Sequence, residues 1–357
     1  VPMQNKLCFE AVDLTLQDIR NNDRLFGGIP VVFGGDFAQI PPVVKKGQRA
    51  QIVDSSIKNS YIWTRCTVLK LTINMRVQGT SPTDELFKNW LNQLSYNPYF
   101  QNTRLRVPPY IYRTVDFNNL INRVYPSEKL LNTTQDSTIF ATSAILTSRN
   151  TTVDSINSSV LSLMPGEIFT LNSVDKADIS NSDDTTNEEL FQISTEYLQS
   201  LNPGNYPPSQ LHLKIGAVVI LLRNLNVEAG LCNGTRLIIK EIGLRILKVV
   251  KLNGIAEATD EIHFIPRINL STLPGQYPFI MTRKQFPIKL CFAMTINKAQ
   301  GQSLNTVGID LRYPVFAHGQ NYVAFSRSTN FKNITVLLDE ENQEERIENV
   351  VYPELLL

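Results

Sequence analysis

A short apolar run that ends in a glycine-rich polar loop constrains the fold of this chain most. The run covers residues 29–33 (IPVVF), and the segment GGDFAQIPPV follows it at residues 34–43. An apolar, β-rich run closed by glycines predicts a buried strand that ends in a loop. Ligands of open α/β sheets bind beyond the carboxyl ends of the strands, so Asp36 and its neighbours are well placed to be functional.

Apolar periodicity predicts the other elements. Helical spacing of apolar residues is found over residues 7–20, 83–94 and 150–164. Short strand patterns are found over residues 67–71, leading into 72–76, and over 138–141 and 144–147. The pattern of residues 290–338 is again that of an α/β fold.

The middle of the chain has a different texture. Strand patterns over residues 216–222, 236–242 and 246–252 are closely spaced and separated by Gly and Asn turns, which predicts a small β-barrel. Residues 172–189 are polar and mostly acidic, which predicts a solvated loop.

Composition narrows the class of partner. The formal net charge of the 357 residues is +1, so a nucleic-acid site would have to be a local groove. The four cysteines and three histidines are too scattered to predict a metal site. No apolar run reaches the roughly 20 residues that span a bilayer, so no membrane partner is expected.

Three segments are hard to explain by packing alone. They are GGDFAQIPPV (34–43), AMTINKAQGQSL (293–304) and HGQNYVAFSRST (318–329). Each follows an apolar strand pattern or opens a helix, and each gathers several hydrogen-bonding side chains in one short loop. Such loops are typical of ligand sites.

These segments resemble motifs III, V and VI of the petite-integration-frequency family of 5′-to-3′ DNA helicases, which belong to superfamily one. The segment LKLTINMR, which ends at Arg76, resembles motif IV. The segments ILTSRN (145–150) and LRNLNVEAGLCNGTRL (222–237) match the branch that includes Helitron-type helicases. The resemblance covers essentially the whole chain, in family order.

The resemblance implies an α/β fold: a RecA-like P-loop NTPase helicase core whose first domain is truncated, with the small β-barrel inserted in the second RecA-like domain. Residues 1–78 are then the C-terminal remnant of the first domain, and residues 79–170 begin the second. Residues 171–289 hold the polar loop and the barrel, and residues 290–357 complete the second domain. Such boundaries are loose when they are predicted from sequence.

The candidate catalytic residues are Gln39, Arg76 and Arg327. An amide both donates and accepts hydrogen bonds, so Gln39 can orient the attacking water or touch the γ-phosphate. Guanidinium groups bind phosphate oxygens bidentately, which makes Arg76 and Arg327 candidates for arginine fingers. A lone arginine is more often a surface residue that forms an ordinary ion pair. Here both arginines stand at positions that match motifs of the family, and this favours the catalytic role.

The other candidate residues flank these. Asp36, Gln300 and Gly301 are candidates for nucleotide binding: Asp36 supports its loop or reaches a metal-bound water, and Gln300 links motif V to the nucleotide. Thr295, Lys298 and Ser303 are candidates for DNA binding, because hydroxyls and an ammonium group suit a phosphate. Thr295 could instead only cap the helix that follows.

Two motifs of the family are absent from these 357 residues. No GxxxxGK[ST] occurs, and the acidic pair that binds Mg²⁺ is missing as well, as though the chain begins just after it. The segment TVLLDE (335–340) also ends in an Asp-Glu pair. It follows the segment that resembles motif VI, however, so we interpret it as a strand end with a solvated acidic tail. The intact family uses ATP and Mg²⁺, and this chain is expected to be inactive alone.

The sequence therefore leaves three functions open. The first is a piece of an ATP-dependent DNA helicase in repair, recombination, telomere maintenance or transposition, with single-stranded DNA, ATP and a separate N-terminal half as partners. The second is a non-catalytic single-stranded DNA-binding or assembly module derived from one. The third is a purely structural α/β protein. The resemblance implies a nuclear or otherwise intracellular protein.

Overall fold

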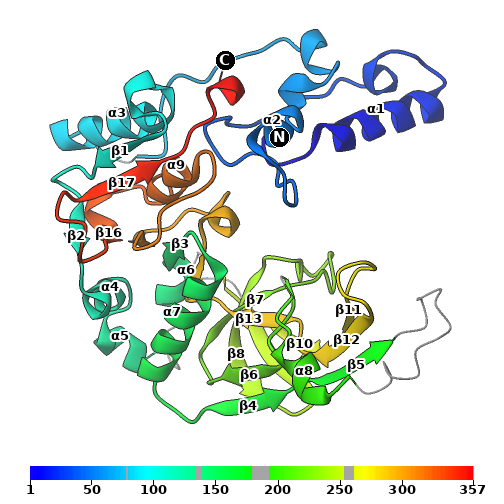
Figure 1. Ribbon diagram of the computed structural model, residues 1–357, viewed down its shortest axis with the longest axis vertical. Helices are drawn as coiled ribbons and strands as arrows, with labels where there is room; N and C mark the ends of the chain where they lie inside the picture. Colours follow the sequence, from blue (N-terminus) through cyan, green and yellow to red (C-terminus); the bar gives the residue numbers. More distant parts are fainter. Residues whose placement is uncertain (78, 133–137, 179–192, 204, 253–260, 357) are drawn as a thin grey trace. The chain divides into compact units, whose positions relative to one another are not determined.

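The computed structural model describes residues 1–77, 79–132, 138–178, 193–203, 205–252 and 261–356. They divide into two units, which Figure 1 shows with their elements labelled. Unit 1 comprises Val1–Val124, Ile145–Asn150 and Met294–Leu357, and unit 2 comprises Tyr125–Ala144 and Thr151–Ala293. The division into four parts that was expected from the sequence stays a prediction.

A five-stranded sheet is the framework of unit 1. Its order is β14-β3-β15-β16-β2, and β16 runs parallel to both β15 and β2. The strands are β2 (Tyr112–Thr114), β3 (Ser143–Thr147), β14 (Ala293–Thr295), β15 (Thr306–Asp310) and β16 (Ile334–Leu337). Every residue of β3 is buried, and the strand predicted over 144–147 is confirmed. The exposed Asp339 and Glu340 follow the end of β16, as expected of a strand end.

The α-helices described in unit 1 are α1 (Lys6–Arg20), α2 (Arg49–Asp54), α3 (Pro82–Tyr96), α4 (Phe117–Val124) and α9 (Gln320–Phe325). Helix α4 packs against β2, β15 and β16, and α3 packs against α9. A capping box between Ser81 and Asp84, with Pro82 at the first turn, begins α3. Asn5 caps the start of α1, and Asn21 ends it in the left-handed conformation. The helices predicted over 7–20 and 83–94 are confirmed.

The remaining elements of unit 1 are short. Strand β1 (Thr103–Arg106) pairs antiparallel with β17 (Arg346–Asn349), and Figure 1 shows this pair beside α3. The single-turn 3₁₀ helices are η1 (Leu25–Gly28), η2 (Ile57–Asn59), η3 (Trp63–Arg65), η4 (Pro98–Phe100), η6 (Ile296–Ala299), η7 (Phe331–Asn333) and η8 (Pro353–Leu355).

Two strands predicted in unit 1 are wrong. Residues 29–33 and 67–76 are extended or irregular, and no described strand pairs with either segment. A strand needs a neighbour to satisfy its backbone groups, and without one its side chains are not buried. Val32 is 95% exposed and Ile73 is 77% exposed, so the apolar pattern of these segments is not used by the core of this chain.

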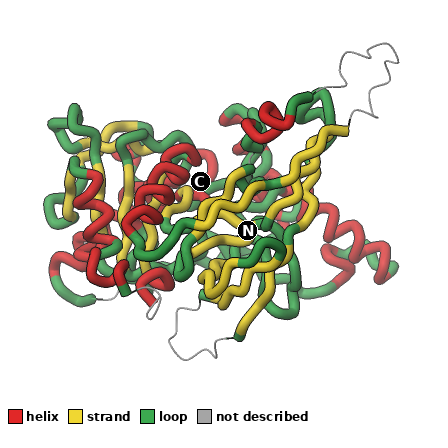
Figure 2. Tube along the Cα trace, turned by 90° about the horizontal axis from the view of Figure 1, so that it is seen from below, coloured by secondary structure: helices red, strands yellow, loops and turns green. Residues whose placement is uncertain are grey.

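Unit 2 is built mainly from antiparallel strands, drawn in yellow in Figure 2. They are β4 (Phe169–Asn172), β5 (Val174–Asp178), β6 (Gln210–Leu213), β7 (Val218–Leu221), β8 (Arg236–Ile242), β9 (Ile246–Lys251), β10 (Ile262–Pro266), β11 (Ile268–Ser271), β12 (Ile280–Gln285) and β13 (Ile288–Leu290). The sheets run β10-β9-β8-β7-β13, β11-β12-β5 and β4-β6. The strand predictions over 216–252 are confirmed, and the closed barrel is not.

The helices of unit 2 include one correction. They are α5 (Ser127–Leu131), α6 (Thr138–Thr142), α7 (Asn150–Leu163) and α8 (Thr195–Ser200), and the helix predicted over 150–164 is confirmed. The strand predicted over 138–141 is wrong, because the segment forms α6. This turn places Phe140 between the rings of Tyr125 and Phe292, at centroid distances of 5.7 and 5.4 Å. Within the described residues, no helix has the length and apolarity to cross a membrane.

The acidic segment of unit 2 also departs from expectation. Residues 174–178 of the predicted solvated loop form β5, and residues 179–189 lie outside the described part of the chain. The Asp175 carboxylate pairs with the Arg283 guanidinium at 2.7 Å, and both side chains are fully buried. Arg283 also donates to the carbonyl oxygens of Pro207 and Leu198. This network joins β5, β12 and α8.

Removing one partner of this ion pair should destabilise unit 2 strongly. Asp175→Ala leaves a buried guanidinium uncompensated, which costs about 3–5 kcal/mol. Urea unfolding followed by circular dichroism, with hydrogen exchange of the β5 and β12 backbone, measures the loss. The matched control is Glu85→Ala, which breaks the partly exposed Lys88–Glu85 pair and should cost less than about 1 kcal/mol. Equal effects of the two substitutions would contradict this account.

Candidate functional site

The turn at Asp36 is organised by its own side chain. The Asp36 carboxylate accepts a hydrogen bond from the Ala38 amide at 3.0 Å and another from the Gln39 side-chain amide at 3.2 Å. The Gln39 backbone amide donates to the Asp36 carbonyl oxygen at 3.1 Å. Two of the predicted site residues, Asp36 and Gln39, are therefore held together in one turn.

Arg327 lies just after α9 and is 1% exposed. Its guanidinium donates to protein acceptors on both sides of the site: the carbonyl oxygens of Val323, Ala299 and Gln302, and the Ser326 hydroxyl. Burial, followed by repulsion from Arg76, lowers the pKa of Arg327 to about 10. The group is still a cation at neutral pH.

Arg76 completes a cluster of opposite charges. Its guanidinium donates to the Ser303 hydroxyl at 3.1 Å, although the two residues are 227 positions apart in the sequence. The charges of Arg76 and Asp36 both act on the pKa of Arg327. The structure thus brings together five of the residues predicted from the sequence: Asp36, Gln39, Arg76, Ser303 and Arg327. We refer to them as the Asp36–Arg327 cluster.

Tyr322 belongs to this cluster and was not predicted as a site residue. Burial raises the pKa of its hydroxyl, and so do the charge of Asp36 and a hydrogen bond to that carboxylate. Tyr96 is also close, because burial and then the charge of Asp36 raise the pKa of its hydroxyl. In the sequence, the only signal for this position was its place in the segment HGQNYVAFSRST (318–329).

The remaining candidates lie on the segment from β14 to the turn after η6. Thr295 occupies the N-cap position of η6, but its side chain makes no capping hydrogen bond there. Lys298 and Gly301 are exposed. The Gln300 side-chain oxygen is buried and accepts no hydrogen bond from any described residue. A buried acceptor without a hydrogen bond destabilises the fold, so the Gln300 oxygen is suited to accept a hydrogen bond from a donor group of a bound ligand.

A hydrogen bond couples this segment to α9. The Gln320 side chain donates to the Asn297 side-chain oxygen at 2.9 Å, while its own oxygen accepts from the amides of Phe316 and Ala317. With the bonds of Arg327 to Ala299 and Gln302, this contact ties two segments predicted from the sequence to one another. A shift of either segment would therefore be transmitted to the other.

Gly319 allows the Asp36 turn to approach α9 closely. A Cβ atom at this position would lie 2.3 Å from the Ala38 carbonyl oxygen, and the φ angle of Gly319 is +74°. Neither the space nor the backbone conformation admits a larger residue. The Asp36 turn therefore lies against the N-terminal end of α9, and Arg327 follows the C-terminal end of the same helix.

The cluster does not supply a magnesium site. Asp36 is its carboxylate, and that group is already bonded to Ala38 and Gln39. Across the described ranges, no three His, Cys, Asp or Glu residues are grouped as metal ligands. Mg²⁺ is usually held by one or two carboxylates together with phosphates and water, and both oxygens of the Asp36 carboxylate already accept hydrogen bonds, so the residues present do not fit this ion.

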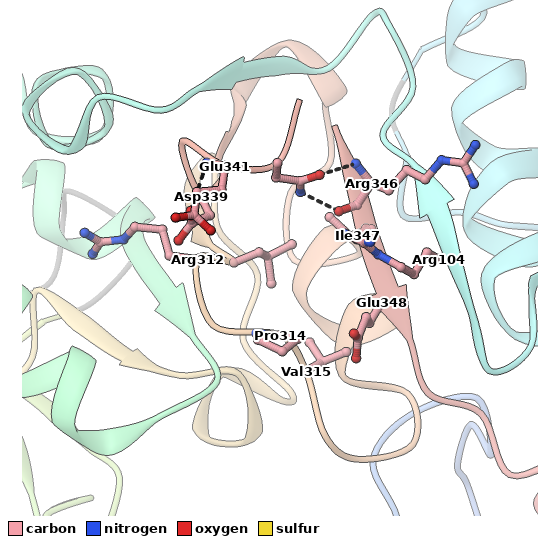
Figure 3. Close-up of a pocket in the computed structure, with 11 residues that line it drawn as sticks. Arg104, Arg312, Pro314, Val315, Asp339, Glu341, Arg346, Ile347 and Glu348 are labelled. Carbon is pink, nitrogen blue, oxygen red and sulfur yellow. Dashed lines mark hydrogen bonds between the residues drawn. The ribbon is translucent and has the colours of Figure 1, made fainter. Parts of the chain in front are cut away.

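A separate pocket of about 320 Å³ lies elsewhere in unit 1, between the end of β16 and β17 (Figure 3). Its lining combines charges of both signs, Arg104, Arg312 and Arg346 with Asp339, Glu341 and Glu348. Figure 3 shows the guanidinium groups of Arg312 and Arg346 directed outward in opposite directions. No predicted site residue lines this pocket.

Comparison with known proteins supports the resemblance to PIF1-type helicases. Residues 1–98 match the model of the PIF1-like helicase family, and residues 196–242 match the model of the 2B domain of the DNA helicase Pif1. The first match contains the Asp36 turn and Arg76, and the second contains β7 and β8. Both matches are to models of PIF1-type helicases, over two separate stretches of the chain.

Individual members of the family are distant relatives. The chain is 28% identical over 330 residues to the ATP-dependent DNA helicase PIF1 of Homo sapiens, which covers 92% of this chain and 44% of the relative. The chain thus spans less than half the length of the vertebrate PIF1 helicases that it matches.

Solved PIF1 helicases share the fold. The crystal structure of Pif1 helicase from Candida albicans matches with a TM-score of 0.64 and 22% identity, over 100% of this chain and 73% of that chain. The Bacteroides Pif1 helicase in complex with ADP-AlF3 and single-stranded DNA matches with a TM-score of 0.62 and 21% identity, over 99% and 71%. The fold is accordingly the RecA-like helicase core. The Helitron branch stays a prediction.

Replacing Gly319 tests the close approach at the site. Gly319→Ala should destabilise unit 1 by about 1–3 kcal/mol more than Gly301→Ala, because its Cβ meets the Ala38 carbonyl oxygen. Gly301 is the matched control, since its φ is +85° and its Cβ would meet nothing within 4 Å. Both tryptophans, Trp63 and Trp90, belong to unit 1, so urea unfolding followed by tryptophan fluorescence measures the difference. Equal destabilisation would contradict the steric argument.

Proposed function

We propose that this chain carries part of the nucleotide site and part of the DNA site of an ATP-dependent 5′-to-3′ DNA helicase. The observation that carries the proposal is the Asp36–Arg327 cluster, in which an amide and two guanidinium groups from distant segments meet. A nucleotide phosphate is the ligand class that such a set recognises. Repair, recombination, telomere maintenance and transposition are the processes that the family offers, in a nuclear or other intracellular setting.

We assign the roles as follows. Gln39 orients the attacking water or contacts the γ-phosphate of ATP, and Arg76 and Arg327 stabilise the charge that develops on the phosphate. Arg76 is the more accessible of the two arginines, whereas Arg327 must exchange an internal hydrogen bond to reach a ligand. Asp36 holds the turn that carries Gln39.

The segment after β14 completes the proposal. Gln300 and Gly301 face the nucleotide, and Gln300 has an unpaired buried oxygen available for it. Thr295, Lys298 and Ser303 bind the phosphates of single-stranded DNA. Ser303 accepts a hydrogen bond from Arg76. DNA bound at Ser303 and a nucleotide bound at Arg76 would therefore contact two residues that are bonded to one another, which supports coupling between the two ligands. The four-part domain division belongs to this proposal as well.

A second candidate is a non-catalytic module that binds single-stranded DNA. It is favoured by the internal bonding of Arg327, whose guanidinium is satisfied by protein acceptors. Both candidates share DNA binding and differ in ATP turnover.

ATP turnover distinguishes the two candidates. Residues 1–357 alone should show no hydrolysis above background, with or without single-stranded DNA at low salt, because they contain no phosphate loop to position the β- and γ-phosphates for the reaction. The measurement is phosphate release in the presence of Mg²⁺, beside Gln39→Ala and Arg327→Ala. DNA-stimulated turnover that both substitutions abolish would overturn the expected inactivity and support the catalytic roles directly.

DNA binding is tested through its salt dependence. Fluorescence anisotropy of a labelled oligothymidine should give an affinity that falls as KCl rises, because counterions are released. Lys298→Ala should weaken binding and reduce the slope of log K against log salt by about 0.7, the value for one phosphate contact on a single strand. The matched control is Lys332→Ala, an exposed lysine of unit 1 whose charge acts on Asp84 instead. Binding that is absent, or unchanged in both variants, contradicts the assignment.

A further inference from the structure

His318, which directly precedes Gly319, is fully buried. Its Nδ1 accepts a hydrogen bond from the Tyr352 amide at 2.8 Å, and its Nε2 lies 2.8 Å from the Phe37 carbonyl oxygen. A nitrogen that accepts from an amide cannot carry a proton, so the proton of the imidazole is on Nε2 and is donated to Phe37. Both bonds require the neutral ring.

The surroundings of His318 hold the ring in this orientation. The Tyr352 ring stacks on the imidazole, with centroids 5.5 Å apart and planes at 29°. The Arg49 guanidinium lies 4.9 Å from the centre of the Tyr352 ring and forms an ion pair with Glu354 at 2.8 Å. His318 therefore joins the C-terminal segment to the Asp36 turn through backbone atoms only.

The bond to Phe37 falls inside the turn that presents Asp36 and Gln39. On the neighbouring side, Gly319 lets α9 approach the carbonyl of Ala38. The Phe37 ring is itself fixed, edge-on to Trp63 at 5.4 Å and beneath the Lys58 ammonium at 4.6 Å. Phe37 is thus held twice: its ring by the contacts with Trp63 and Lys58, and its carbonyl oxygen by His318.

We propose that His318 is a positioning residue: as a neutral imidazole it holds the Asp36–Gln39 turn in register with Arg327 by linking the Phe37 carbonyl to the Tyr352 amide. The proposal rests on the proposed function, in which this turn presents Gln39 to a nucleotide. His318 touches no substrate in this role. Its effect reaches Gln39 through the backbone of the turn.

The groups that face His318 set its response to pH. Burial lowers the pKa of His318, opposed by the bond to Phe37 and by the carboxylates of Asp36 and Glu354, while Arg49 adds to the lowering. A histidine whose folded pKa is lowered stabilises the fold above its unfolded pKa. That contribution is lost as pH falls through the folded value. The turn should therefore loosen below about pH 6.5, the ordinary value for histidine.

The test compares two substitutions of similar size in the full chain. His318→Leu fills the space but bonds to neither backbone group, whereas His318→Gln can donate and accept without titrating near neutral pH. Hydrogen exchange of the Ala38, Gln39 and Tyr352 amides should be about tenfold faster in the leucine variant at pH 7.5, the effect of losing about one net hydrogen bond. The glutamine variant should stay within about threefold of the unsubstituted chain. Urea unfolding followed by tryptophan fluorescence reports whether unit 1 of each variant is folded.

Lowering the pH supplies a test without any substitution. From pH 7.5 to pH 5, exchange of these amides, corrected for its intrinsic pH dependence, should accelerate in the unsubstituted chain and not in the glutamine variant. Equal exchange in the leucine and glutamine variants, or an unsubstituted chain that behaves like the glutamine variant across the pH range, would overturn the proposal.

Binding of a fluorescent, non-hydrolysable ATP analogue, which carries the γ-phosphate that Gln39 is proposed to contact, separates this proposal from the proposed function. If exchange responds as expected and the analogue binds more weakly to the leucine variant than to the glutamine variant, both stand. If exchange responds but the analogue binds none of the three proteins, His318 still positions the turn, and the nucleotide role of the turn is what fails.

Discussion

The buried guanidinium of Arg327 is the interaction on which the candidate site depends. A cation that is 1% exposed must be compensated, and Arg327 achieves this with acceptors on α9 and on the segment after η6. A lysine could not replace it, because an ammonium group lacks the planar fork that reaches acceptors on two sides at once. Arg327 therefore helps to fix the relative position of the two segments, together with the hydrogen bond from Gln320 to Asn297.

The charges of the cluster explain why it suits an anion. Burial, followed by repulsion from Arg76, lowers the pKa of Arg327, while Tyr322 and Asp36 act in the opposite direction. Two guanidinium groups held close together with a single carboxylate leave an excess of positive charge in a partly buried place. A bound phosphate would relieve that repulsion, whereas a second protein carboxylate is not present in the cluster. Perturbed groups of this kind gather at functional sites more often than in structural networks.

The sequence predicted the helices of this chain better than its strands, for a physical reason. A helix satisfies its own backbone, and α1 and α3 carry their start signals in Asn5 and in the Ser81–Asp84 capping box. A strand depends on a neighbour that local sequence does not contain. Residues 29–33 and 67–76 have the right composition for strands but no described partner, and the acidic Asp175 is buried only because Arg283 lies 108 residues away.

The same distinction separates the site residues that could be predicted from those that could not. Asp36, Gln39, Arg76 and Arg327 were visible because their side chains carry the chemistry. His318 was not, because its partners are a carbonyl oxygen 281 residues away and an amide 34 residues away, and every residue has such backbone groups. A side chain that acts by holding backbone leaves no complementary residue in the sequence to point to it. Residues of this kind are found only when the distance between the turn and α9 is known, and that distance is set here by the absence of a side chain at Gly319.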